Sequence, residues 1–176
     1  MGVRRLAGLA ATAVLVLAGC QIAEVETPDP ASIPAGSIQP QGATPTGPVV
    51  ELGSGVASGI GWRYSIFPSD DGWCTQLETV SVTTAGCGDL LPEEGRAFGG
   101  VSHSGTIVDG LVTEETATVW LIADGVVHLL PATLLSLEEA GLEGQAFVGI
   151  APAEANITHV QALKFSGEVL ESYELP

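Results

Sequence analysis

Basic residues are scarce in this chain. Its 176 residues include 5 Lys and Arg against 21 Asp and Glu, which gives a formal net charge of −16 at pH 7. Two of the five, Arg4 and Arg5, lie in an N-terminal segment that we expect to be removed, so the mature chain carries 3 minus 21, or −18. A surface this negative repels phosphate backbones and anionic lipid headgroups. We therefore expect no nucleic-acid partner.

The chain also lacks the short motifs of the common enzyme classes. It contains no G-x-S-x-G, no H-E-x-x-H, no Walker loop and no dinucleotide-binding glycine fingerprint. Ser102 and His103 are neighbours, but neighbours on a strand point to opposite faces, so adjacency does not make them a catalytic pair. The histidines at 103, 128 and 159 lie on three different predicted strands without metal-ligand spacing. We expect no cofactor, and a non-enzymatic role is the favoured hypothesis.

The apolar run at the N terminus is too short for a transmembrane helix. It covers residues 6–17 and follows a positive head at 1–5, whereas about 20 apolar residues are needed to cross a bilayer. A positive head, an apolar stretch and small residues, in this order, are typical of a secretory signal peptide. We therefore predict that residues 1–19 are a signal peptide that is cleaved from an exported protein.

This segment closes with Leu17-Ala18-Gly19-Cys20, which resembles the lipobox of bacterial lipoproteins. The resemblance covers residues 1–20, and the rest of the chain looks like small envelope lipoproteins without matching the pattern of one family. It implies transfer of a diacylglyceryl group to the thiol of Cys20, cleavage between Gly19 and Cys20, and attachment to the extracytoplasmic face of the cell membrane. Two or three acyl chains form a stable anchor. The membrane, reached through lipid on Cys20, is thus an expected partner.

Cysteine is rare, and its number fits an exported chain. Of three cysteines, lipidation of Cys20 leaves Cys74 and Cys87. Exported proteins commonly keep such a pair oxidised. The alternative, a metal or redox pair, lacks C-x-x-C spacing and a nearby third ligand, since His103 is sixteen residues beyond Cys87. We predict a Cys74–Cys87 disulfide.

Proline is concentrated ahead of the strand-forming region. Residues 21–48 hold six of the eleven prolines among Ala, Ser, Thr and Gly, without apolar periodicity. These six are Pro28, Pro30, Pro34, Pro40, Pro45 and Pro48. We predict a lipidated tether over 20–48 and a folded domain over 49–176.

Strand patterns dominate the predicted domain. Residues 61–67 alternate between apolar and polar side chains, which is the period of a half-buried strand. A turn at 68–72 and a strand at 73–83 complete a predicted hairpin. Two more hairpins are expected around Asp124-Gly125 and Ser166-Gly167, with strands at 116–122, 126–130, 157–165 and 168–173. Weaker strand candidates are 49–52, 97–102, 106–112 and 146–150.

One segment alone favours a helix. Ser136 and Glu139 have capping-box spacing and Gly141 follows as a stop, so we predict a single turn. Imperfect alternation over 157–165 predicts a bulge or an edge strand there. Eight or nine short strands predict an all-β fold, an antiparallel β-sandwich that is immunoglobulin-like, with a small β-barrel as the alternative.

Aromatic residues gather in the first predicted hairpin. Trp62, Tyr64, Phe67 and Trp73 fall within twelve residues, just before Cys74. One interpretation is an exposed platform that stacks on a sugar or peptide, with Trp62, Tyr64 and Trp73 as candidate binding residues. The other, which we favour, is a core in which Trp packs against the disulfide, as in immunoglobulin-like sandwiches.

Acidic pairs occur at the predicted turns. Asp70 and Asp71 are weak candidates for a Ca²⁺ site, because no complete calcium-loop pattern surrounds them. One alternative function is an envelope hydrolase that uses carboxylates such as Asp70, Asp71 or Asp109. Another is a calcium-stabilised structural or adhesive module. The favoured hypothesis is a non-enzymatic binding module, anchored in the cell envelope, that contacts an envelope protein or ligand.

Overall fold

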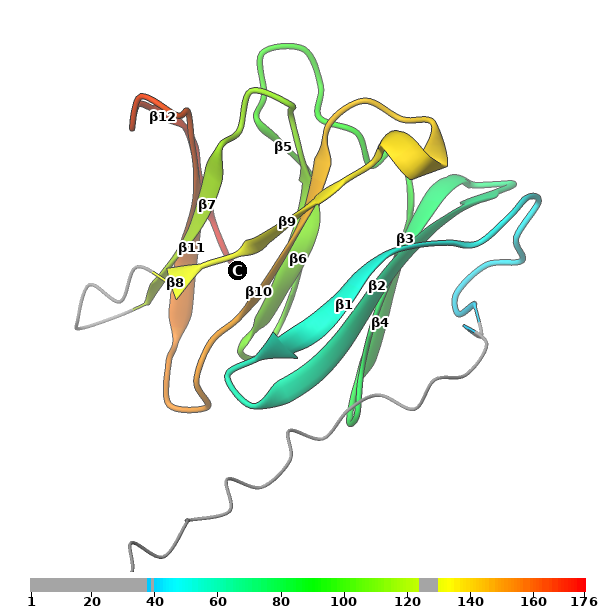
Figure 1. Cartoon of the computed structure of the whole chain (residues 1–176), viewed down its shortest axis with the longest axis horizontal. Helices are drawn as coiled ribbons and strands as arrows, with labels where there is room; N and C mark the ends of the chain where they lie inside the picture. Colours follow the sequence, from blue (N-terminus) through cyan, green and yellow to red (C-terminus); the bar gives the residue numbers. More distant parts are fainter. Residues whose placement is uncertain (1–37, 39, 124–129) are drawn as a thin grey trace, which may run out of the picture.

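Twelve β-strands form three antiparallel sheets in the computed structural model, which describes residues 38, 40–123 and 130–176 (Figure 1). Sheet A contains, in spatial order, β1 (Val50–Ala57), β2 (Ile60–Ser69), β3 (Gly72–Thr79) and β4 (Thr83–Gly88). Sheet B contains β5 (Phe98–Ser104), β6 (Ile107–Val112), β10 (Gln145–Ile150) and β9 (Thr133–Ser136). Sheet C contains β12 (Val169–Glu174), β11 (Ile157–Leu163), β7 (Thr118–Ala123) and β8 (Leu130–Pro131). The all-β class is confirmed, and the described strands form open sheets of a β-sandwich rather than a closed barrel.

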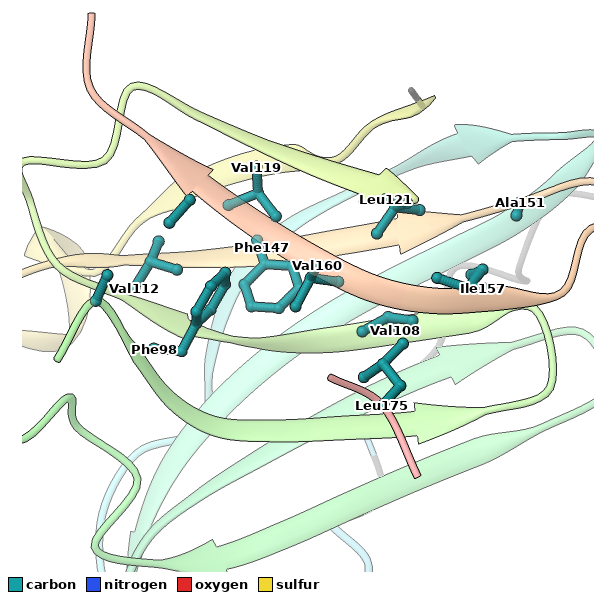
Figure 2. Close-up of a cluster of buried hydrophobic side chains, with 12 residues drawn as sticks. Phe98, Val108, Val112, Val119, Leu121, Phe147, Ala151, Ile157, Val160 and Leu175 are labelled. Carbon is teal, nitrogen blue, oxygen red and sulfur yellow. The ribbon is translucent and has the colours of Figure 1, made fainter. Parts of the chain in front are cut away.

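The three sheets are stacked, with sheet B in the middle. One face of sheet B packs on sheet C, where Val108 and Phe147 meet Val119 and Val160 (Figure 2). The other face packs on sheet A through Ile107, Leu111, Ala146, Val148 and Ile150. Because both of its faces are covered, β6 is buried along its whole length. This burial explains why 106–112 and 146–150 read as nearly continuous apolar runs instead of alternating ones.

More strands form than the eight or nine that we expected. The predicted strand at 73–83 is interrupted, because the Thr79 N–H donates to the Val82 carbonyl at 2.7 Å and the Thr79 hydroxyl accepts from the Val82 N–H at 2.9 Å. The chain then reverses into β4. The sequence of β4, TTAGCG, has no large apolar side chain, so it carries little strand signal of its own.

Two of the predicted hairpins are confirmed. β2 and β3 pair up to Ser69 and Gly72, which leaves Asp70-Asp71 as the loop. β11 and β12 pair around a turn in which Gly167 has a φ of 84° and donates its N–H to the Lys164 carbonyl at 2.9 Å. β7 and β8 are also antiparallel neighbours, but the predicted turn at Asp124-Gly125 lies outside the described residues.

The irregularity predicted over 157–165 is a bulge. Its register shifts between Ile157 and His159 against β7, and between Ala162 and Leu163 against β12. β11 lies between these two strands, so it is an interior strand and not an edge. The extra residue lets Ile157 and Val160 both reach the core although they are three positions apart.

The predicted helical turn is a 3₁₀ turn at Glu138–Ala140 (η1). The capping box predicted for it is not formed, because no side chain caps the turn. The Ser136 hydroxyl accepts from the Glu138 N–H at 3.2 Å, two residues along the chain, instead of from the third residue. A local Ser turn therefore leads into η1 in place of a helix cap. Gly141 ends the turn in the left-handed region with a φ of 72°, as predicted.

The end of the predicted tether is part of the folded domain. The Gln41 N–H donates to Gln76 Oε1 at 2.7 Å, and the Thr46 N–H donates to the Pro68 carbonyl at 2.9 Å. We call residues 41–46 the strap. The predicted boundary at 49 is thus too late, because composition does not reveal hydrogen bonds made with distant residues of sheet A.

Candidate functional site

Two members of the predicted aromatic platform are buried. Trp62 is 4% exposed and Tyr64 is 0% exposed, and both pack with Ile66 and Leu77 between sheets A and B. Trp73 is half-buried at the border of the same core. The exposed platform is therefore wrong for Trp62 and Tyr64, and the core interpretation of these residues is confirmed.

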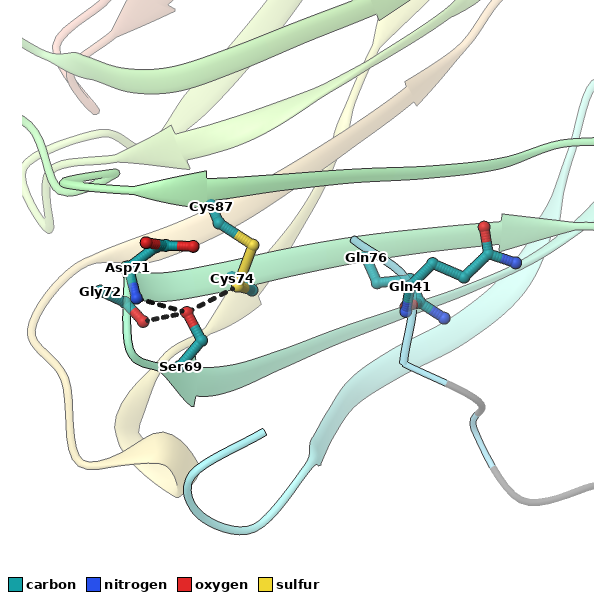
Figure 3. The surroundings of a disulfide bond; sticks show 7 residues. All are labelled: Gln41, Ser69, Asp71, Gly72, Cys74, Gln76 and Cys87. Carbon is teal, nitrogen blue, oxygen red and sulfur yellow. Dashed lines mark hydrogen bonds between the residues drawn. A yellow bond between two sulfur atoms is a disulfide. The ribbon is translucent and has the colours of Figure 1, made fainter. Parts of the chain in front are cut away.

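The predicted disulfide between Cys74 and Cys87 is confirmed, in a position that differs from the immunoglobulin pattern. It joins directly opposed residues on the adjacent strands β3 and β4, with Cα atoms 4.1 Å apart, instead of linking two sheets. Cys74 is three positions before Leu77, so it points to the outer face of sheet A, away from the core that holds the buried tryptophan. The Ser69 hydroxyl lies 3.2 Å from the Cys74 sulfur (Figure 3). The expected packing of Trp against the disulfide is not found for Trp62.

A polar cluster is buried between sheets A and B. Asp109 on β6 is 3% exposed and interacts with Tyr64 on β2 and Ser102 on β5. Burial raises the pKa of Asp109 to about 7, although the nearby hydroxyls of Tyr64 and Ser102 partly oppose this rise by favouring the carboxylate. The Tyr64 hydroxyl lies near Asp109 and Thr75 but makes no fully formed hydrogen bond to either. Burial, followed by the charge of Asp109, raises the pKa of Tyr64 well above its ordinary value.

This cluster does not resemble a pair of glycosidase carboxylates. Asp109 is sealed from solvent, whereas Asp70 and Asp71 are exposed on the β2–β3 loop. The groups that shift the pKa of Asp109 include no second carboxylate. Two carboxyls that face one cleft are what that chemistry requires, so the three predicted carboxylates do not assemble into one site.

The remaining candidate ligands are also dispersed. Among residues 38, 40–123 and 130–176, no group of three or more His, Cys, Asp or Glu could hold a metal ion, so Asp70 and Asp71 gain no third ligand there. His103 Nε2 lies 2.8 Å from the Gly105 carbonyl, and His159 Nδ1 lies 3.0 Å from the Thr158 hydroxyl. His128 and Cys20 lie outside the described residues.

A groove on the outer face of sheet C presents the aromatic surface that sequence reasoning placed elsewhere. Val119 and Leu121 point into the core, so Trp120 between them points outward and is half-buried. Phe165 follows β11 at the hairpin turn and is 98% exposed. We name this feature the Trp120 groove; it is lined by Ala117, Thr118, Trp120, Leu163, Lys164, Phe165 and Gly167. Aromatic faces of this kind supply large, rigid contact areas for a ligand.

One cation lies in the wall of the groove. Lys164, the only lysine of the chain, has its ammonium nitrogen 3.7 Å from a carboxylate oxygen of Glu115 and 3.7 Å from one of Glu168. The two glutamates are largely exposed and Lys164 is half-buried, and such ion pairs near the surface contribute about 0–1 kcal/mol each. They can therefore exchange partners when a ligand binds without a large loss of stability.

A second hollow is lined by an arginine whose role is to hold two strands together, so we do not assign it a ligand. It is lined by Arg96 and Thr113, among others, but Arg96 Nε donates to Glu171 Oε1 at 2.7 Å. Glu171 also accepts from the N–H groups of Ala97 and Phe98, at 2.7 and 3.2 Å. Burial raises the pKa of Glu171, but these hydrogen bonds outweigh burial and lower it. Glu171 therefore fixes the start of β5 against β12.

Comparison with protein-family models, with curated proteins and with solved structures gives no match for this chain. In the part of the chain that the structure describes, no helix has the length and apolar character needed to cross a membrane.

The sequence did not predict the Trp120 groove, because Trp120 and Phe165 are 45 positions apart whereas the aromatic residues at 62–73 form a dense group. One signal was available in Phe165, which directly precedes the turn residues Ser166-Gly167. Turn tips are usually polar, so a large aromatic side chain at this position is unexpected for a purely structural role. The orientation of Trp120 could not be read in the same way, since either face of a strand can be the buried one.

Proposed function

We propose that the protein is a lipid-anchored, extracytoplasmic interaction module that binds its partner through the Trp120 groove. The lipobox at 17–20 supports the anchor, since it follows a positive head and an apolar stretch. The stacked β-domain supports a binding role, since its buried acidic residue is closed to substrate while an aromatic groove is open to solvent.

The observation that carries the proposal is the exposure of Phe165. A phenylalanine side chain that moves from water into an apolar contact gains roughly 1.5–3 kcal/mol. At 98% exposure, Phe165 gains almost none of this in the isolated domain. Its neighbour Trp120 offers a second ring in the same groove, and exposed aromatic anchors of this kind carry much of the energy of protein contacts.

The binding surface is tested by chemical crosslinking of the full-length protein in its native envelope. Phe165→Ser and Trp120→Ala should remove the same crosslinked species, because both rings line one groove. Val56→Ser is the matched control, since Val56 is also an exposed apolar residue, at 50%, but lies on sheet A. Phe165 is 98% exposed and contributes almost nothing to packing. Phe165→Ser therefore reports on binding even if Trp120→Ala lowers stability. An unchanged set of species in both groove variants would overturn the proposal.

The anchor is tested separately. Cys20→Ser removes the thiol that the lipobox would lipidate, so the variant should leave the membrane fraction and lose incorporation of a radiolabelled fatty acid. The binding variant Phe165→Ser serves as the control, because it should keep both properties. A Cys20→Ser protein that stays in the membrane fraction would contradict lipid anchoring at this position.

A further inference from the structure

We infer that the partner of the Trp120 groove is a protein surface with Lys or Arg residues around an apolar centre, and that it docks on the side of the domain opposite the strap. This inference rests on the proposed function. Its two parts follow from the position of the strap and from the charges near the groove.

The strap and the groove lie on opposite sides of the stack. The strap crosses the outer face of sheet A, where Gln41 binds Gln76 on β3 and Gly42 lies over Ala85 on β4. The Trp120 groove lies on the outer face of sheet C, beyond the middle sheet, and Figure 1 shows the β11–β12 hairpin and the strap at opposite ends of the long axis. Stacked sheets are about 10 Å apart, so roughly 20 Å of protein separates the two outer sheets.

This arrangement leaves the groove clear of the strap. The strap lies on the outer face of sheet A, whereas the groove lies on the outer face of sheet C. Phe165 is therefore placed to contact a protein, and insertion into an anionic lipid surface is disfavoured by the negative charge of the chain.

The charges around the groove select a basic partner. Glu115 and Glu168 are 67% and 65% exposed beside one ammonium group, that of Lys164 at 37%. The rest of the mature chain adds to the negative field, since the total is 3 minus 21, or −18. Complementary charge around an apolar contact speeds association and rejects like-charged surfaces. A second copy of this chain has the same negative charge, so self-association through the groove is disfavoured.

The experiment places a photoreactive aromatic residue at 165, Phe165→p-benzoylphenylalanine, in the full-length protein within its native envelope. The same residue at Val56 is the control, because Val56 lies on sheet A at the other side of the stack. Crosslinking is repeated at 50 and 500 mM NaCl, with Trp120→Ala, and with the charge reversal Glu115→Lys and Glu168→Lys. Both glutamates are largely exposed, so the reversal should leave the melting temperature nearly unchanged.

We expect a protein crosslink from 165 and not from 56, with a yield that falls at least fivefold at high salt and in the charge-reversal variant. The crosslinked peptide of the partner should hold more Lys and Arg than Asp and Glu. If Trp120→Ala removes the crosslink but salt and charge reversal do not, the groove binds and the inferred chemistry of the partner is wrong. A product of twice the protein's mass, a lipid product or a glycan product would likewise overturn the inference. If no product depends on Trp120, the proposed function itself fails.

Discussion

Replacement of Asp109 by Asn should remove a pH-dependent loss of stability. Asp109 is buried between sheets A and B, and its pKa in the folded protein is about 7 against an ordinary value of 3.8. The folded state thus binds this proton more tightly than the unfolded state does. Its stabilising effect is complete below about pH 4 and is lost as the pH rises to about 7.

The size of the effect follows from the difference between the two pKa values. A difference of about three units corresponds to about 4 kcal/mol in the free energy of unfolding. Asn has the shape of Asp and no charge, so Asp109→Asn should match the wild type near pH 3.5 and exceed it by up to about 4 kcal/mol at pH 8. Asp70→Asn is the control, because Asp70 is exposed on a loop and surface changes rarely exceed about 0.5 kcal/mol.

The assay is urea unfolding with the disulfide intact, followed by tryptophan fluorescence from pH 3.5 to 8.5. The buried Trp62 makes the signal sensitive to separation of sheets A and B. The difference between Asp109→Asn and the wild type cancels the contribution of the other carboxylates. Parallel unfolding curves for the two proteins across this pH range would refute the reasoning, as would a carboxyl carbon of Asp109 that titrates near pH 4 in an NMR experiment.

Two further predictions concern the sites that fasten strands together. Removal of the disulfide by Cys74→Ser with Cys87→Ser should lower the free energy of unfolding by roughly 3 kcal/mol, because the bond closes a short loop in the unfolded chain. Urea unfolding at pH 7 measures this loss. A loss below about 1 kcal/mol would contradict the prediction. Glu171→Gln should cost about 1–2 kcal/mol at pH 7, because the charged acceptor of Arg96 and of two backbone N–H groups is lost. Since the pKa of Glu171 is lowered in the fold, its stabilising effect is present above its unfolded pKa and is lost as the pH falls through its folded pKa. The difference between the variant and the wild type should therefore shrink as the pH falls below the ordinary value of 4.5. A difference that does not change with pH would argue against this account.

Local patterns were enough to predict several features correctly. The alternation over 61–67, the loop at Asp70-Asp71 and the turn at Ser166-Gly167 each correspond to a strand or hairpin in the structure. These signals depend on neighbouring residues alone, through side-chain alternation and turn chemistry. The Cys74–Cys87 disulfide was found by counting cysteines, since it was the one pair left after Cys20.

Other features depend on which sheet covers which face. Alternation shows that Trp62 and Trp120 each lie on one side of a strand, but it does not say that sheet B covers the first while the second stays on an outer face. The burial of Asp109 has the same origin, because a carboxylate on a strand is expected to face water unless a second sheet packs on it. The strap is also a tertiary feature, since Gln41 finds its acceptor on Gln76, far along the chain.

Short-range patterns and composition were sufficient to predict the β class, the first and last hairpins and the disulfide pair, and they carry the expectation of a lipid anchor. The stacking of three sheets, the burial of Trp62 and Tyr64 in the core and the exposure of Phe165 depend on the tertiary arrangement. A strand has two faces, and which of them is buried depends on the other sheets that pack against it.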